Sequence, residues 1–213
     1  MKTHDLIDVL SLDDTPANVQ WMQRRVGPAV LLAALLCLLI AETLWSVRSD
    51  MQEAVLLAAF WFKLGFAVSL ALIAAWALPS AARPVGLHIQ RVWYLLLPVV
   101  VIWVRALGVL LEAPAADLPT LVYGQTWQKC SLLIVALALP MLVASLWACK
   151  EAAPSKPRLT GFVLGVLSGA IAASIYSLHC VEMSAFFIGI WYALGILVTG
   201  LLGLFLGGRV LRW

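Results

Sequence analysis

Long apolar segments separated by short polar connections follow one another from residue 27 to the end of the chain. Their approximate bounds are 27–46, 54–78, 92–111, 127–148, 159–178 and 184–207. Each is close to the roughly 20 residues that an α-helix needs to cross about 30 Å of hydrocarbon. The pattern therefore predicts an all-α fold: a polytopic membrane protein in which residues 27–213 form a six-transmembrane-helix bundle.

Residues 1–26 form the one sizeable polar segment, and their start is too polar and acidic for a secretory signal. Leu6, Ile7 and Leu10 recur at helical spacing, with Asp5 and Asp8 on other faces. This spacing predicts a short amphipathic helix in a retained amino-terminal segment. Its apolar face could dock into a groove of a partner protein, or the helix could lie on the lipid surface.

Composition supports the membrane class, because 63% of the residues are hydrophobic and only 12% are charged, against about 25% in soluble domains. The distribution of Lys and Arg predicts orientation better than the net charge of +3 does. Ten of these residues fall on the side of the two termini: Lys2, Arg24, Arg25, Arg83, Arg91, Lys150, Lys156, Arg158, Arg209 and Arg212. The opposite connections hold Arg48 and Lys129. We therefore expect both termini to be cytoplasmic, and since orientation explains the basic loops, we expect no direct binding of nucleic acid.

Three charged residues fall inside predicted spans: Glu42, Lys63 and Arg105. Each costs about 2.5–3.5 kcal/mol on insertion scales, so such side chains usually face the bundle and find partners. One interpretation is a structural ion pair or triad. The other is a polar path for ions or protons, which would make the chain a small transporter or a membrane redox protein.

The spacing of Gly161, Gly165 and Gly169 predicts a smooth helix face in the fifth span. Glycines four residues apart let another helix approach closely. We interpret this face as a packing surface without chemistry of its own.

Two of the four cysteines are expected at the same depth, at the outer boundary: Cys130 opens the fourth span and Cys180 lies between the fifth and sixth, beside His179 and Glu182. A disulfide staple, a responsive pair and inert thiols are all consistent with this placement. The responsive pair could be a reversible thiol switch, or a soft-metal site with Cys130, Cys180 and His179 as ligands.

The residues do not form a catalytic arrangement. We find no Ser-His-Asp set, no paired carboxylates at a polar cleft and no haem-type His pair. We therefore expect no enzymatic activity and no resident cofactor, with a transient heavy-metal ion as the only inorganic ligand.

Several motifs together resemble the NrsF family, the negative regulators of SigF. They are Leu178-His179-Cys180-x-Glu182-x-Ser184-Ala185-Phe186-Phe187, Trp191, the closing Gly207-Gly208-Arg209-x-Leu211-Arg212-Trp213, the early Asp5-Leu6-Ile7-x-x-Leu10 and Trp127-x-x-Cys130. The chain departs from the family pattern at Val181, where Pro is usual, and at Tyr192, where His often follows Trp191.

The resemblance implies a bacterial inner-membrane anti-sigma factor that holds an extracytoplasmic-function (ECF) sigma factor on the cytoplasmic side, away from RNA polymerase. It implies that Leu6, Ile7 and Leu10 bind the sigma factor. It also implies that Cys130 and Cys180, with His179 and Glu182 beside them, respond to oxidative or heavy-metal stress. Neither the residues nor the resemblance predicts an oligomeric state.

Overall fold

The computed structural model describes residues 19–44, 48, 50–82, 89–114, 118–151 and 154–212, and these are helical apart from short connections. The all-α prediction is confirmed for them. The candidate sigma-binding residues Leu6, Ile7 and Leu10 lie outside the described residues.

Among the described residues, six helical stretches are long and apolar enough to cross a membrane, which is the number that the hydrophobic pattern predicts. The long helices are α2 (Val19–Leu44), α4 (Ala58–Ala82), α5 (Leu96–Glu112), α7 (Trp127–Lys150), α8 (Pro157–Tyr176) and α10 (Ala193–Val210). Shorter elements extend or connect them: α3 (Met51–Ala54), the 3₁₀ helix η1 (Ile89–Leu95), α6 (Leu118–Tyr123), α9 (Ala185–Phe187) and the π-helix η3 (Ile188–Tyr192). Because η3 joins α9 to α10, the last candidate span runs from Ala185 to Val210.

The second helix is displaced along the chain from its expected bounds of 54–78. It begins at Ala58, because the preceding residues form the separate helix α3 and a turn. It continues through Pro79 to Ala82, where a proline removes only one hydrogen bond near a helix end. The last carbonyls are satisfied from outside the helix, since Thr160 Oγ1 donates to Ala81 O at 3.2 Å and Ser155 N donates to Ala82 O at 3.1 Å.

Helix α8 is the centre of the bundle: 78% of its apolar window is buried, against 22% for α2 and for the stretch that contains α5. The predicted glycine face packs against α10. A Cβ atom on Gly161 would lie 2.1 Å from Gly203 O, and one on Gly165 would lie 2.2 Å from Thr199 O. These positions must therefore be glycine for the two backbones to approach so closely.

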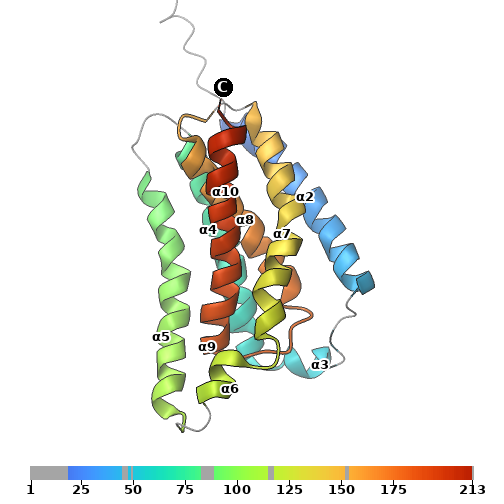
Figure 1. Cartoon of the computed structure of the whole chain (residues 1–213), viewed down its shortest axis with the longest axis vertical. Coiled ribbons are helices and arrows are strands. Elements are labelled where there is room, and N and C mark those ends of the chain that lie inside the picture. The colour runs from blue at the N-terminus through green and yellow to red at the C-terminus, as the bar shows by residue number, and fades with distance from the viewer. Residues whose placement is uncertain are drawn as a thin grey trace, which may run out of the picture.

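The elements divide the bundle into two ends (Figure 1). The carboxy terminus lies at one end, and α3, α6 and α9 lie at the other. The connection 177–184 between α8 and α9 belongs to this second end, which we call the hairpin end. Helix α5, which continues directly from η1, stands at the edge of the bundle and packs mainly on α9.

Candidate functional site

The two candidate thiols meet at the hairpin end. Cys130 lies in the first turn of α7 and Cys180 in the connection after α8. The two side chains lie close enough for Cys130 to lower the pKa of Cys180, and neither cysteine forms a disulfide. Both are buried, with exposed fractions of 0% and 3%. The structure thus brings together two cysteines whose proximity the sequence left open.

Lys63, in the second turn of α4, points into this site. Its side chain is fully buried, and its ammonium group donates to Cys180 O at 2.6 Å and to Glu182 O at 3.0 Å. A buried ammonium group is costly unless it is hydrogen-bonded, so these two carbonyls explain how α4 carries a lysine. The lysine joins α4 to the thiol-bearing connection.

The surroundings of Cys180 favour its thiolate. The neighbouring Cys130 side chain, together with the nearby Lys63 charge, lowers the pKa of Cys180 to about 6 although burial acts in the opposite direction. A thiolate is the form that attacks oxidants and binds soft metals. Cys180 is therefore the more nucleophilic member of the pair.

Two tyrosines that the sequence analysis did not select line the same site. Tyr176 from α8 and Tyr192 from η3 lie beside Cys180, with their rings 6.0 Å apart. Tyr192 Oη is buried without a partner at good hydrogen-bond geometry, although it is close enough to Cys180 to contribute to lowering that pKa. The one feature of the sequence that could have identified Tyr192 as a site residue was its departure from the family pattern. π-Helical turns often occur at functional sites, and here η3 carries Trp191 and Tyr192.

Arg48, which entered the sequence analysis only as a loop charge, is also buried at this site. It donates to Cys180 O at 3.4 Å and is paired with Asp50 through two hydrogen bonds. The Asp50 hydrogen bond raises the pKa of Arg48, so the guanidinium stays charged. Cys180 O thus receives two cationic donors, Arg48 and Lys63.

Glu182 fastens the connection to the turn between α6 and α7. Its Oε1 accepts a hydrogen bond from Gln125 N at 2.6 Å. Neighbouring Gly124 has a φ of 51°, and a Cβ atom there would lie 2.6 Å from the Glu182 carboxylate. The carboxylate therefore rests on a turn that requires glycine for both its conformation and its space.

Three further side-chain hydrogen bonds join the same region to α6 and α7. Ser184 Oγ donates to Leu121 O at 3.3 Å, and Trp191 Nε1 donates to Val122 O at 2.8 Å. Ser131 Oγ donates to Trp191 O at 2.7 Å. The hairpin end is therefore a hydrogen-bonded unit that includes the first turn of α7, where Cys130 lies.

His179 is directed to a different set of partners. Its Nδ1 lies 3.2 Å from Ile175 O, and its Nε2 lies 3.8 Å from Glu42 Oε1. Within the described ranges, no group of three or more His, Cys, Asp or Glu side chains could hold a metal ion. The proposed ligand set of Cys130, Cys180 and His179 is therefore not assembled in this conformation.

The three charges predicted inside the spans do not form one cluster. Glu42 lies beside His179, Lys63 binds the carbonyls of the connection, and Arg105 lies over the Phe62 ring at 5.4 Å. A joint triad or a continuous polar path through these three residues is not what the structure shows. Each has a separate local role.

Comparisons with known proteins place the chain in a family. A family model described as "Negative regulator of sigma F" (NrsF) matches residues 10–213. A protein of Azospira oryzae named probable anti-sigma-F factor NrsF is 40% identical, and one of Caulobacter vibrioides named anti-sigma-F factor NrsF is 35% identical; each alignment covers 100% of both chains. No solved structure matches the chain. The resemblance carried by the hairpin, Trp127-x-x-Cys130 and the closing Gly-Gly-Arg motif is thereby confirmed: the chain belongs to the NrsF family of negative regulators of sigma F.

Proposed function

We propose that this chain is an anti-sigma factor of a bacterial inner membrane that binds an ECF sigma factor on its cytoplasmic side and releases it when Cys130 and Cys180 are oxidised. The full-length similarity to two proteins named as anti-sigma-F factors supports the regulatory role. The paired thiols at the hairpin end support the input, and their contact is the observation that carries this part of the proposal.

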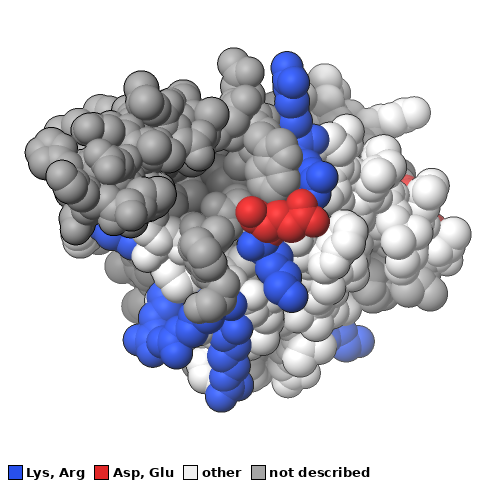
Figure 2. Space-filling model, turned by 90° about the horizontal axis from the view of Figure 1, so that it is seen from above, with Lys and Arg blue, Asp and Glu red and all other residues white. Residues whose placement is uncertain are grey.

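The membrane placement rests on the six apolar helical stretches and on the basic residues. An even number of spans puts both termini on one side, and the Lys and Arg excess of that side supports its placement in the cytoplasm. Several basic side chains lie on the described surface at the end that carries the carboxy terminus, around one acidic group near its centre (Figure 2). The hairpin end then faces the periplasm, where thiols are within reach of oxidants.

The proposed oxidation begins at Cys180, because its lowered pKa makes it the more nucleophilic of the two thiols. The Cys180 thiolate attacks one oxygen of a peroxide, the O–O bond breaks, and the second oxygen leaves as hydroxide or water, which forms a sulfenic acid on Cys180. The Cys130 thiol then displaces water and closes the disulfide. Two electrons pass to the peroxide, and the two thiols lose two protons.

The output requires that oxidation changes the contacts of the connection. Disulfide formation removes the thiolate charge that faces Lys63 and fixes Cys180 to the first turn of α7. We propose that this alters how α4 and α7 pack at the hairpin end and that the change reaches the amino-terminal segment with Leu6, Ile7 and Leu10. Release needs two states that differ in sigma affinity by a few kcal/mol.

The decisive experiment compares stress induction in two double variants. Cys130→Ser with Cys180→Ser should keep the sigma factor bound under peroxide or chromate, so that its target genes stay at their uninduced level. Cys37→Ser with Cys149→Ser, which changes buried thiols elsewhere in the bundle, should induce as the unchanged protein does. Normal induction in the first variant would exclude thiol sensing while leaving sigma binding intact.

A further inference from the structure

A groove between α4 and α5 is built of membrane-spanning helices and is not part of the thiol site. Its volume is about 570 Å³, within the range of small-ligand pockets. Its walls are almost wholly apolar and include Trp61, Phe66, Ile73, Leu97 and Val101. The groove lies between α4 and α5 where the two helices make few contacts, because α5 packs mainly on α9.

One end of the groove carries a cation. Arg105 is exposed, and within the part of the chain that the structure describes no carboxylate lies at ion-pair distance from it. Its partner is the Phe62 ring at 5.4 Å. A guanidinium beside apolar walls is costly without an anion, so this position favours an anionic ligand.

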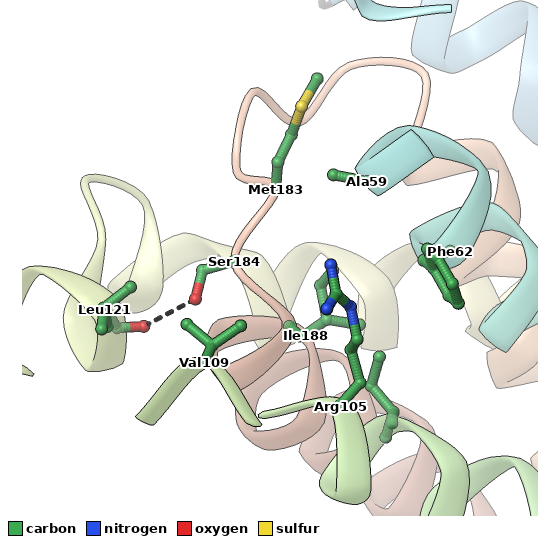
Figure 3. A pocket seen from close by; sticks show the side chains of 10 residues that line it. Ala59, Phe62, Arg105, Val109, Leu121, Met183, Ser184 and Ile188 are labelled. Atoms are coloured by element: carbon green, nitrogen blue, oxygen red, sulfur yellow. Dashed lines mark hydrogen bonds between the residues drawn. The ribbon is translucent and has the colours of Figure 1, made fainter. Parts of the chain in front are cut away.

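Arg105 also marks the border between the groove and the hairpin end. A second cavity of about 100 Å³ continues past it and is lined by Met183 and Ser184. Figure 3 shows the Arg105 side chain extending from α5 between Phe62 of α4 and the segment that carries Met183 and Ser184. The charged group of a bound molecule would therefore lie beside Arg105 and the segment that carries Met183 and Ser184, with its apolar part in the groove.

The length of the groove suits an acyl chain. Its lining residues on α4 run from Ala58 to Ile73, a rise of fifteen residue steps or about 22 Å at 1.5 Å per residue, which exceeds the roughly 15 Å of hydrocarbon in one leaflet. Gly65 leaves its wall open, because a Cβ atom at that position would meet nothing within 4 Å.

We propose that this groove binds one anionic phospholipid of the outer leaflet, with the phosphate on Arg105 and an acyl chain between α4 and α5. The proposal rests on the membrane placement in the proposed function. A lipid is favoured over a soluble ligand because the groove belongs to two apolar helices that would face the bilayer. An anionic headgroup is favoured because Arg105 lacks a carboxylate partner among the described residues.

The test is native mass spectrometry of the purified full-length protein with phosphatidylglycerol or phosphatidylcholine of identical acyl chains. The unchanged protein should retain the anionic lipid about fivefold more strongly, the size of effect expected for one basic residue near an anionic headgroup. Arg105→Gln should abolish this preference, and Arg105→Lys should keep it.

A second pair of variants separates the groove from the general lipid annulus. Gly65→Leu fills the groove and should reduce retention of both lipids. Gly108→Leu is the matched control on α5, since a Cβ atom at Gly108 also meets nothing within 4 Å and Gly108 does not line the groove. Its lipid retention should be unchanged.

Three outcomes would overturn the proposal: equal retention of both lipids by the unchanged protein, a preference that survives Arg105→Gln, or a dimer that Gly65→Leu dissociates. The last would assign the groove to a second copy of the chain. Sigma-factor binding by the same preparations is a separate measurement. Lost lipid preference with retained sigma binding therefore contradicts only the lipid site, and the reverse contradicts only the anti-sigma role.

Discussion

At the scale of single residues, the interpretation of Lys63 changes most. Its position inside an apolar span was consistent with an ion path, but its hydrogen bonds to Cys180 O and Glu182 O instead join α4 to the connection 177–184. Its charge also acts on the Cys180 thiolate. One buried residue thus supports both the position and the chemistry of the candidate sensor.

The reactivity of Cys180 should depend on its neighbour Cys130. The neighbouring Cys130 side chain lowers the pKa of Cys180, so its thiolate should form at a lower pH than that of an ordinary thiol. Cys130→Ala removes the largest cause of the lowered pKa, so the midpoint should move upward toward the ordinary thiol range near 8.5. The measurement is the initial rate of Cys180 alkylation by iodoacetamide against pH, read by peptide mass spectrometry. An unchanged midpoint would show that the thiols do not interact.

Gly124 should be intolerant of even a methyl group. Gly124→Ala places a side chain at a φ of 51° and against the Glu182 carboxylate. The left-handed conformation alone costs about 1–2 kcal/mol for an L-residue. The apparent Tm of the detergent-purified protein, taken at a fixed scan rate, should fall, whereas Gly108→Ala should leave it nearly unchanged because its Cβ meets open space. Equal Tm values for the two variants would contradict the turn described here.

At the scale of elements, the contact of α8 with α10 fixes the position of the thiol-bearing connection. Close backbone approach along Gly161, Gly165 and Gly169 holds α8 against α10, and Cys180 lies in the connection that follows α8. The π-helix η3 then interrupts the α-helical hydrogen bonding of the last span near Trp191 and Tyr192. These two features together determine which side chains face Cys180.

Gly161→Ala should separate α8 from α10. The added Cβ would lie 2.1 Å from Gly203 O, a backbone atom that cannot move aside as a side chain does. Overpacking of this kind typically costs about 1–3 kcal/mol. Thermal unfolding should therefore occur at a lower temperature than for the matched variant Gly27→Ala, whose Cβ meets nothing within 4 Å. A fully stable Gly161→Ala variant would mean that the helices do not approach as described.

At the scale of the whole molecule, the candidate input and the proposed output lie far apart. The thiols are at the hairpin end, and the end with the carboxy terminus lies across the length of the bundle (Figure 1). Helices α4, α7 and α8 run between the two ends, and α4 and α7 begin beside the thiol site. They are the elements through which a change at the connection could act.

The orientation has a direct consequence for reporter fusions. Green fluorescent protein fused after Trp213 should fluoresce, because we place the carboxy terminus in the cytoplasm. Alkaline phosphatase fused after Pro114, between α5 and α6, should be active because it would reach the periplasm. The opposite pair of results would reverse the topology and move the thiols into a reducing compartment.

The chain's own pattern was sufficient to predict the helical class, the six apolar stretches, the glycine face and the two cysteines at one boundary. These are local properties: hydropathy, helix length and spacing depend on residues near one another in the sequence. Only the tertiary structure decided that the thiols touch, that Lys63 binds carbonyls 117 and 119 residues away, and that His179 is directed to Glu42. Such contacts depend on the rotation and depth of each helix against its neighbours, which here follow from the α8–α10 glycine contact and the π-helical turn of η3.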